Sequence, residues 1–439
     1  MSLPSRTRSL LCCLGLLIGV PALADDALDE DMGGPLPSAR DNRPRGAPPP
    51  MMAPAREPEL KSEPEVKSEP LAAVQAPKRR EARAIHARNP WAIVSEHVHE
   101  QAIDDIPEPP GPHRFAPLGQ LEIAGTVYYP YTFDGHVHSE HSPDADHPVV
   151  DMLARAEREG LSALVLTDHG SSRSALSFPK YKGPLKAFVG QEIGGEYGHA
   201  VWWNVDAPWG GSRQTLAQRA AFAHERGGLI VLCHPGWWIG GREHDPMLWV
   251  RPDALRDGGI SGDIDALEIW NGVYDRPLPK LIDAWVDALE AGIYVPVVGN
   301  SDFHRFRSHR LGGPRNVVLC DKPDVGSCLW SAIKAGRLYV TDGPTLNLTV
   351  NGKTFGEQVA HGLLDVSLEA VSPRGGELRL YVGRELAKAW SLRPDVREQF
   401  HWSGAPTAAS SYVRVEIVRT LPGREAPVYE LISNPVLTR

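Results

Sequence analysis

The sequence predicts an α/β fold, a closed or nearly closed barrel of seven strands and intervening helices, followed by a small β-sandwich. Between Tyr128 and Gly343, short apolar runs alternate with helix-like stretches, which is typical of repeated β-α units. Histidine and acidic residues follow the ends of these runs, where the strands of a parallel barrel share one site. Beyond Pro344, turn residues separate apolar runs and no helical pattern intervenes, which is typical of a sandwich.

The first residues are typical of an export signal. Arg6 and Arg8 form a positive segment, residues 10–20 are apolar, and Ala22 and Ala24 are the small residues of a cleavage site. The apolar run is too short to cross a bilayer, and no later run approaches about 20 apolar residues. We expect a signal peptide, a secreted or periplasmic protein and no transmembrane segment after signal cleavage. An uncleaved anchor is the alternative.

A composition change marks the domain organisation. Residues 25–88 are dense in proline and charge, so they bury too little apolar area to order and are predicted to be a disordered linker. No pattern assigns the connecting segment that follows. The predicted divisions are therefore 1–24 signal peptide, 25–88 linker, 89–127 connecting segment, 128–343 barrel and 344–439 β-sandwich.

The apolar runs predict the individual strands. In the barrel they cover 131–138, 163–167, 187–192, 229–233, 266–270, 295–299 and 317–320. Helical patterns at 149–160 and 214–227 lie between them and end near a glycine that can cap a helix. In the sandwich the predicted strands are 345–350, 364–371, 377–383, 412–418 and 429–432.

Charge and cysteine content exclude two classes of protein. The formal net charge of −9 argues against a nucleic-acid coat. Signal cleavage would remove Cys12 and Cys13, and the odd number that remains excludes a complete disulfide framework. Cys320 and Cys328 could pair in an oxidising compartment. Cys233 lies in an apolar run, so we expect it to be buried and without a chemical role.

Metal-type ligands follow strand after strand. His136 and His138 end the first strand, where alternation places both imidazoles on one side and lets them bind one cation. An isolated histidine is more often a plain core or surface residue, but repetition at strand ends favours a metal site. The candidate ligands are His136, His138, Asp144, His169, Glu192, His199, His234, Asp302 and His304.

The order of the motifs carries a resemblance. The chain has His-x-His at 136–138, Thr-Asp-His at 167–169, Gly-x-Glu at 190–192, His-Pro at 234–235 and Ser-Asp-x-His at 301–304. This series resembles the PHP (polymerase and histidinol phosphatase) superfamily, over roughly half of the chain. The resemblance implies a distorted (β/α)7 barrel that binds two or three divalent metal ions. An amidohydrolase barrel fits less well, because it usually needs a modified lysine where Glu192 stands.

The resemblance also implies which ligands share a cation. By it, His136, His138, Glu192 and Asp302 form a first site, Glu192 bridges to a second site with His199 and His234, and Asp144, His169 and His304 form a third. This chain departs from the family where His199 closely follows Glu192. It departs again at Asp144, which replaces a histidine of some members and favours Mn²⁺ or Fe²⁺ over Zn²⁺ there.

Charge suggests a mechanism for such a site. Two cations bridged by Glu192 would lower the pKa of a bound water, generate a hydroxide nucleophile and polarise the substrate oxygen. Asp168 is expected beside the ligands, where it orients an imidazole or accepts a proton. Glu268 either does the same or pairs with a basic residue, and both alternatives stay open.

Two sets of side chains bear on the substrate. Arg173 and Arg305 follow metal motifs, and their guanidinium groups could grip a phosphate with paired hydrogen bonds. Arg307 and Arg310 are expected in a solvated basic loop. Trp237 and Trp238, in a glycine-rich loop, could line an apolar pocket. These features predict a small, anionic ester substrate.

A second resemblance widens the range of reactions. Residues 336–344 and the terminal 433–435 resemble the carbaryl-hydrolase-like (CehA/McbA-type) branch of the superfamily, which places a β-rich segment after the barrel. We expect an exported metal-dependent hydrolase, first a phosphoesterase, that uses Zn, Mn or Fe. The alternatives are carbamate or carboxylester hydrolysis in the same site and, from another class, a non-catalytic metal-binding interaction module.

Overall fold

The computed structural model describes residues 117–195, 198–207, 215–235, 263–273, 278–305, 309–406, 412–424 and 426–439. All of these belong to one compact unit, Arg80–Arg439. The predicted signal peptide, the linker and most of the connecting segment lie outside the described residues, as do Trp237, Trp238 and Arg307. Of the helices that are described, none combines the length and the apolar character needed to cross a bilayer.

The first part of the described chain, which we call the α/β region, runs from β1 to β10. Its strands are β1 Leu121–Ile123, β2 Thr126–Asp134, β3 Ala163–Leu166, β4 Lys186–Gly195, β5 Gly198–Trp203, β6 Leu229–Leu232, β7 Ala266–Asn271, β8 Val297–Asn300, β9 Arg315–Cys320 and β10 Leu338–Thr341. Its helices are α2 Val149–Arg158, the 3₁₀ helix η3 Arg173–Lys180, α3 Leu216–His224, α6 Leu278–Glu290 and α7 Val325–Lys334.

The rest of the chain, which we call the β region, contains strands only among its described residues. They are β11 Thr345–Val350, β12 Gln358–Val359, β13 Leu364–Val371, β14 Gly376–Val382, β15 Glu385–Leu392, β16 Arg397–Gly404, β17 Tyr412–Arg419, β18 Val428–Ser433 and β19 Val436–Thr438. β11 and β13 have the predicted bounds. β12, β15, β16 and β19 were not predicted, and neither were β1, β5 and β10 in the α/β region.

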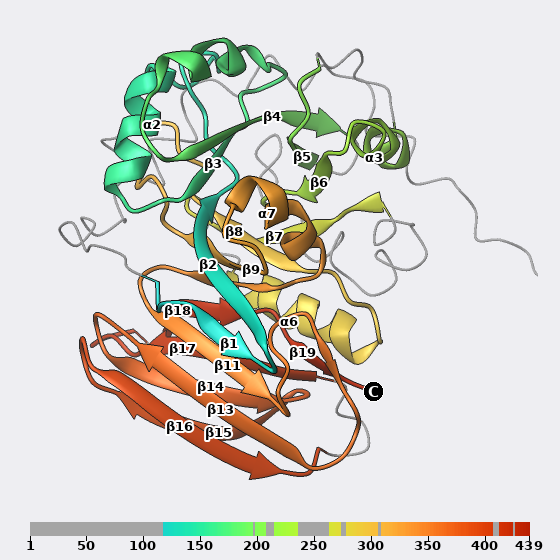
Figure 1. The fold of residues 1–439 in the computed structure, drawn as a ribbon, viewed down its shortest axis with the longest axis vertical. Coiled ribbons are helices and arrows are strands. Elements are labelled where there is room, and N and C mark those ends of the chain that lie inside the picture. The colour runs from blue at the N-terminus through green and yellow to red at the C-terminus, as the bar shows by residue number, and fades with distance from the viewer. Residues whose placement is uncertain are drawn as a thin grey trace, which may run out of the picture. The chain divides into compact units, whose positions relative to one another are not determined.

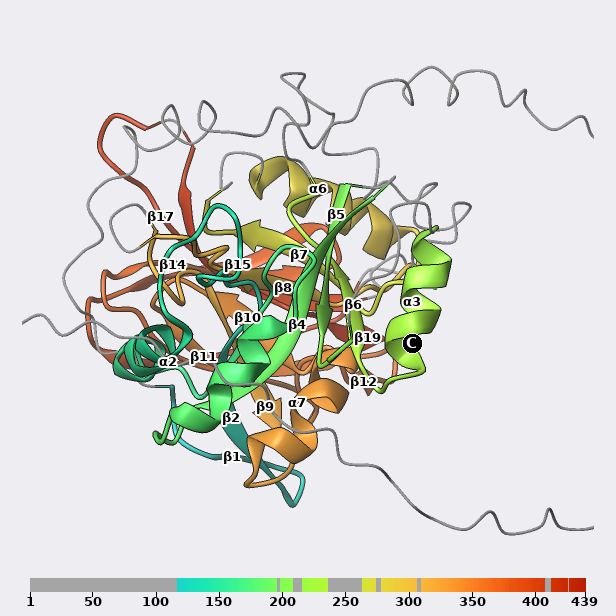
Figure 2. The same ribbon diagram turned by 90° about the horizontal axis from the view of Figure 1, so that it is seen from above.

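Local sequence explains the helices. Leu281, Trp285 and Leu289 recur along α6 at helical spacing and are all buried. α3 begins with a capping box. The Thr215 side chain accepts a hydrogen bond from the backbone N–H of Gln218, and the Gln218 side chain accepts one from the backbone N–H of Thr215. Figure 2 shows α2, α3, α6 and α7 arranged around the strands of the α/β region.

The barrel that the sequence predicts as closed or nearly closed is not closed among the described strands, and its (β/α)7 detail stays a prediction. The strand order of the sheet is β9-β2-β3-β4-β5-β6-β7-β8, and from β9 it continues through β10 and β18 into the β region (Figure 1). β9 pairs with β2 along one edge and with β10 along the other. Its backbone therefore has no edge left for β8. The β2–β9, β4–β5 and β5–β6 pairs are antiparallel, so the sheet is also not the parallel one expected.

Two buried asparagine side chains form hydrogen bonds with backbone groups of β8, which among the described strands is paired with a neighbouring strand, β7, along one edge only. The Asn316 side chain accepts from the backbone N–H of Gly299 at 2.9 Å and donates to its carbonyl at 2.7 Å. The Asn434 side chain does the same for Val297, with both bonds at 2.8 Å. Because buried backbone groups need partners, these amides satisfy the strand that leads to the site. Asn434 comes from the β region.

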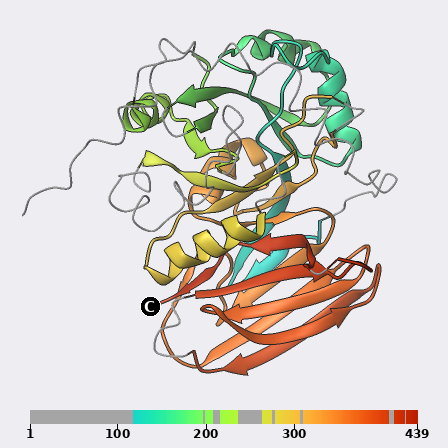
Figure 3. The same ribbon diagram turned by 180° about the vertical axis from the view of Figure 1, so that it is seen from behind.

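The β region consists of two packed layers of strands. β11, β13 and β16 form a three-stranded sheet, and β14, β15, β17, β18 and β19 belong to the large sheet. Leu348 and Leu368 of the first layer share a core with Leu380 and Val415 of the second. On the other side of the second layer, Trp285 of α6 lies in a cluster that joins the two regions, and Figure 3 shows α6 beside these strands.

The cysteines behave in part as predicted. Cys320, at the end of β9, forms a disulfide with Cys328 of α7, which is the pairing that the sequence left possible. Cys233 is buried and free, as expected. Its position turns out to matter for the site described next.

Candidate metal centre

The ligands lie just beyond the strand ends. β2 ends at Asp134, before His136 and His138, so the predicted strand 131–138 is wrong at this end. The two histidines nevertheless flank Val137, which forms an isolated β-bridge with Phe303. Extended backbone at Val137 buries this residue and sends the imidazoles on either side of it into one site. The predicted same-side arrangement is therefore present, but it is held by a bridge rather than by a strand.

Gly135, directly after β2, allows the backbone to lie close to Trp203 of β5. The indole N–H of Trp203 donates to the Gly135 carbonyl at 2.6 Å. A Cβ at position 135 would lie 2.4 Å from the Trp203 ring. Any larger residue would therefore displace either the Trp203 ring or the backbone that carries His136.

Glu192 of β4 is the centre of a histidine–carboxylate cluster. Its Oε1 lies 2.5 Å from His199 Nδ1 and 3.0 Å from His234 Nε2. Its Oε2 lies 3.0 Å from His169 Nδ1, 3.3 Å from His138 Nε2 and 3.5 Å from His136 Nε2. The two carboxylate oxygens thus face different groups of imidazoles, which is the arrangement that a bridging carboxylate requires.

Two aspartates complete the cluster. Asp302 Oδ1 lies 3.2 Å from the Nε2 atoms of both His136 and His138. Asp144 Oδ2 lies 3.1 Å from His169 Nε2 and 3.3 Å from His304 Nε2. The structure therefore brings all nine predicted ligands into one connected group, which we call the cluster. Their roles as ligands stay predictions.

Unsatisfied atoms show that divalent cations fit this cluster. The Nε2 atoms of His136 and His138 and the Oδ1 atoms of Asp144 and Asp302 are buried and make no hydrogen bond within the described part of the chain. Each such atom costs about 1 to 3 kcal/mol. Imidazole nitrogens mixed with carboxylate oxygens are the ligands that Zn²⁺, Mn²⁺ and Fe²⁺ accept. A cation between these atoms would satisfy them.

The atoms fall into three candidate groups, within each of which one ligand atom per residue lies within 4.8 Å of the others. The groups are His136, His138 and Asp302; His136, Glu192, Cys233 and His234; and His138, Asp144, His169 and His304. Compared with the predicted sites, His136 and Cys233 join the second group, His138 joins the third, and Glu192 is not in the first. His199 contacts Glu192 but is not part of these groups.

Glu268 of β7 orients a ligand and is itself fully engaged. Its Oε2 lies 3.1 Å from His136 Nδ1 and accepts from the Asn300 side chain at 2.8 Å. Its Oε1 accepts from the Asn271 side chain at 2.7 Å and from the backbone N–H of His234 at 3.1 Å. A proton on Nδ1 of His136 leaves the Nε2 lone pair for a cation. Of the two alternatives, the geometry favours ligand orientation, and no basic side chain is among these partners.

Asp168 is connected to the imidazole of His138 through serine side chains. It accepts from the backbone N–H of Ser139 at 2.6 Å and from its hydroxyl at 2.8 Å. Burial raises the pKa of Asp168, although the hydrogen bonds from Ser139 and a further one from Ser142 lower it. Ser142 Oγ in turn lies 2.9 Å from His138 Nδ1. Asp168 thus holds the loop that orients His138, and does not touch that ring directly.

Sequence reasoning missed three supporting residues. Ser142 is one, and Asn271 is another, since its amide also donates to Asp302 Oδ2 at 3.1 Å. The third is Asp134, which accepts from the Ser301 hydroxyl at 2.6 Å and from the Gly312 N–H at 2.9 Å. Burial raises the pKa of Asp134 to about 6. Its place in the motif Asp-Gly-His was a signal that could have found it.

Burial and neighbouring charge set the protonation of the cluster. Burial lowers the pKa of His136, but the carboxylates around it, Asp302 foremost, outweigh burial and raise it well above its ordinary value. Burial raises the pKa of Glu192, yet the surrounding imidazoles hold it well below its usual range. Burial and neighbouring imidazoles lower the pKa of His138 to about 3. Protons therefore compete with cations for some of these nitrogens.

One side of the cluster faces solvent. The side chains of His169 and Asp144 are 27% and 32% exposed, whereas that of His138 is fully buried. Arg173, at the start of η3, and Arg305, directly after His304, are exposed. The described contacts tie neither arginine to the cluster, so their role with an anion stays a prediction. Arg310 is not the solvated residue expected, because it pairs with Asp342.

The comparisons with known proteins agree with the motifs. Residues 134–296 match the family model described as PHP domain, so the resemblance is confirmed for this range, and the motif at 301–304 lies beyond it. Among curated proteins none matches the chain. The finer resemblance to the carbaryl-hydrolase-like branch stays a prediction.

Several solved structures are distantly similar. One is a two-domain protein of Bacteroides vulgatus that contains a predicted PHP-like metal-dependent phosphoesterase, with 15% identity, TM-score 0.44, and coverage of 74% of this chain and 100% of that one. Another is a proposed metal-dependent phosphoesterase from Bifidobacterium adolescentis. It has 14% identity and a TM-score of 0.32, and the match covers 41% of this chain and 90% of that one. A third is an amidohydrolase of Chromobacterium violaceum with bound sulfate and no metal. It has 15% identity and a TM-score of 0.33, and the match covers 47% of this chain and 96% of that one. These likenesses are too weak to assign an activity.

Proposed function

We propose that this protein is an exported PHP-type hydrolase that cleaves small anionic phosphoesters with two or three divalent cations. The observation that carries the proposal is the cluster around Glu192, whose buried ligand atoms on His136, His138 and Asp302 lack hydrogen bonds. The PHP domain match supports the same chemistry. Zn, Mn and Fe are the candidate metals, because the donors are imidazoles and carboxylates.

Cations bound in the cluster would supply Lewis-acid activation of water and of the substrate oxygens. The chain's own contribution is to orient the ligands beforehand. Glu268 holds the ring of His136, and Ser142 holds the ring of His138. Ligands whose partners are already in place need no rearrangement when charge develops during the reaction.

The exposed side of the cluster is where the substrate would enter. His169 and Asp144 line it, and Arg173 and Arg305 follow metal motifs in the sequence and are exposed. Their guanidinium groups would attract a phosphate and hold it by paired hydrogen bonds. Asp168 and Glu268 position other groups rather than touch the substrate, because their oxygens are occupied by described donors.

Export is proposed on two grounds. The amino-terminal residues have the composition of a signal peptide. The Cys320–Cys328 disulfide agrees with folding in an oxidising compartment. Detection of the protein in a periplasmic or extracellular fraction, with the first residues removed, would test this part of the proposal.

Turnover by metal-loaded protein tests the reaction. We expect hydrolysis of p-nitrophenyl phosphate or of its diester, loss of that hydrolysis with a chelator, and recovery when Zn²⁺, Mn²⁺ or Fe²⁺ is returned. Elemental analysis of the same sample gives the number of bound cations. Cleavage of aryl carbamates or carboxylic esters alone would replace the phosphoesterase proposal with the ester alternative. Full metal content without turnover of these compounds would favour the interaction module.

A further inference from the structure

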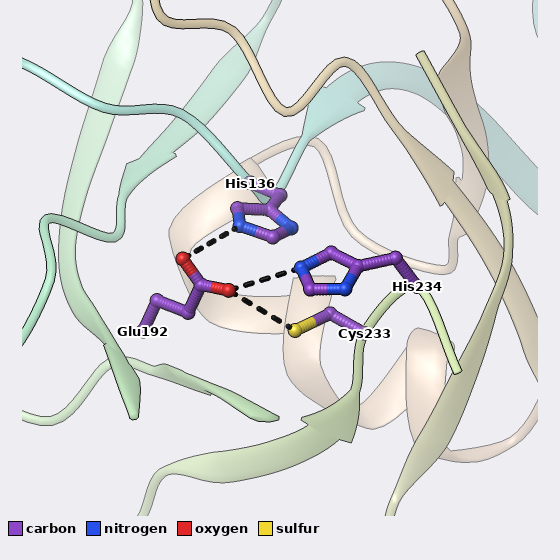
Figure 4. Close-up of side chains that lie close together, drawn as sticks. All are labelled: His136, Glu192, Cys233 and His234. Atoms are coloured by element: carbon purple, nitrogen blue, oxygen red, sulfur yellow. Dashed lines mark hydrogen bonds and ion pairs between the residues drawn. The ribbon is translucent and has the colours of Figure 1, made fainter. Parts of the chain in front are cut away.

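We propose that Cys233 supplies a thiolate ligand to the cation held by Glu192 and His234, so that this position takes a thiophilic metal such as zinc. The inference rests on the proposed metal-dependent function and concerns the ligands of one position only. Figure 4 shows the four side chains involved, which come from three separate segments of the α/β region and point toward one another. The fourth is His136.

The distances bring sulfur into the same group as the other donors. Cys233 Sγ lies 3.7 Å from Glu192 Oε1. The same oxygen lies 3.0 Å from His234 Nε2. One ligand atom from each of the four residues lies within 4.8 Å of the others. A tetrahedral site built from sulfur, nitrogen and oxygen is typical of zinc.

A second observation is independent of the cysteine. His136 is completely buried, and its Nε2 makes no hydrogen bond within the described part of the chain. That atom lies 3.5 Å from Glu192 Oε2. The group therefore contains an unsatisfied buried nitrogen next to the carboxylate that Cys233 also contacts, and a cation would satisfy it.

Backbone geometry explains how two consecutive residues reach one site. In a strand, Cys233 and His234 would point to opposite faces. β6 ends at Leu232, and His234 has φ of 27°, in the left-handed region that residues other than glycine rarely adopt. Such strained positions concentrate at functional sites. Here the strain turns the chain so that both side chains face Glu192.

The chemistry of sulfur gives the consequence. A thiol binds a cation as the thiolate, so the S–H bond is replaced by a bond to the metal and one proton passes to solvent. Thiolate is a soft ligand that prefers zinc to manganese. His199, the ligand that the resemblance assigns to this position, lies 2.5 Å from Glu192 Oε1. His234 Nε2 makes the same kind of contact with this oxygen at 3.0 Å, so the sulfur is a donor in addition to His199 rather than in its place.

Cobalt substitution tests the ligand directly. Full-length protein carrying Cys12→Ser and Cys13→Ser keeps Cys233 as its single free thiol, because Cys320 and Cys328 are paired. We expect Co²⁺ to bind and to produce sulfur-to-cobalt charge-transfer absorption in the near ultraviolet. This measurement needs no change at Cys233. Cys233→Ser in the same background should take up cobalt elsewhere in the cluster without that absorption, and His199→Ala should retain it.

Metal affinity supplies a second readout. Loss of a group that merely supports a ligand costs about ten- to a hundredfold in affinity, so Cys233→Ser should weaken zinc by at least that much. Manganese binding should change much less, because manganese prefers oxygen. Circular dichroism in the presence of a chelator checks that the variant is folded, and Cys233→Ala serves as the second variant.

The outcomes separate this inference from the proposed function. Cobalt uptake without the charge-transfer absorption would overturn thiolate ligation and leave metal-dependent hydrolysis standing. Equal loss of zinc and manganese in the serine variant would also overturn it. Protein that takes up no cation at all would overturn both proposals.

Discussion

The cluster and the core of the β region are both buried, but they differ in whether the chain itself supplies partners for the buried polar atoms. In the β region, Leu348 and Leu380 pack in a core of apolar side chains. A charge at its edge has a partner within the chain, since Arg374 lies 2.7 Å from Glu430. In the cluster, His138 Nε2 is buried without a hydrogen bond among the described residues.

This difference shows where each region gets its stability. The β region is completed by its own side chains, so apolar contact stabilises it whatever ions are present. The cluster gathers imidazoles and carboxylates that pair with one another, but several of its buried ligand atoms make no hydrogen bond among the described residues, which is costly. It therefore depends on cations that the chain does not supply. Substitutions in the two regions should then have different consequences.

Removal of a cluster histidine should have the largest effect. We expect His138→Ala to lower turnover by about a thousandfold or more, because electrostatic stabilisation of the reacting groups is lost. The fold should persist, as judged by circular dichroism. The matched control is His401→Ala in β16, an exposed histidine that pairs with Asp365 and should leave turnover unchanged. Full activity of His138→Ala would refute the assigned site.

A cavity in the β region should act on stability alone. Leu348 is completely buried in β11, and Leu348→Ala should lower the free energy of unfolding by about 2 to 5 kcal/mol. The metal content of the folded protein should stay the same. Leu363→Ala is the control, because that side chain is 69% exposed and its loss should change the melting temperature little. A parallel fall in metal content would contradict the separation of the two regions.

Asn434 tests the connection between the regions. Asn434→Ala leaves the N–H and the carbonyl of Val297 without the two bonds that the amide makes. Since each unsatisfied buried group costs about 1 to 3 kcal/mol, the loss of both bonds should lower stability by about 2 to 6 kcal/mol. β8 leads to Asp302, so metal affinity should fall as well. Unchanged metal affinity, measured by calorimetry, would show that the β region does not support the site.

Support of a single ligand should have the smallest effect. Glu268→Gln removes the charge that faces His136 Nδ1 but keeps the shape of the side chain, and it should weaken metal binding by about ten- to a hundredfold. Equilibrium competition with a chelator measures the change. Glu377→Gln in β14 is the control, because that carboxylate is 44% exposed and pairs with Arg379. If the two variants bind metal equally well, Glu268 does not orient the ligand.

Local pattern was sufficient for much of the β region. The bounds of β11 and β13 follow from apolar residues that alternate with polar ones, because alternate side chains face a core on one side only. β15 was missed because its residues are largely exposed or half-buried, so it carries no clear apolar face. The pairing of β10 with β9 and β18 was also out of reach, because pairing depends on which edges remain available.

The amino-acid sequence by itself determined the donor set, since histidines and acids recur after strand after strand, and that recurrence is a local property. Only the tertiary structure decided which atoms face one another. The left-handed backbone at His234 brings Cys233 toward Glu192, and Glu268 reaches His136 from a different strand. Such contacts depend on backbone turns and on distant segments, and the alternation of residues along one strand contains neither.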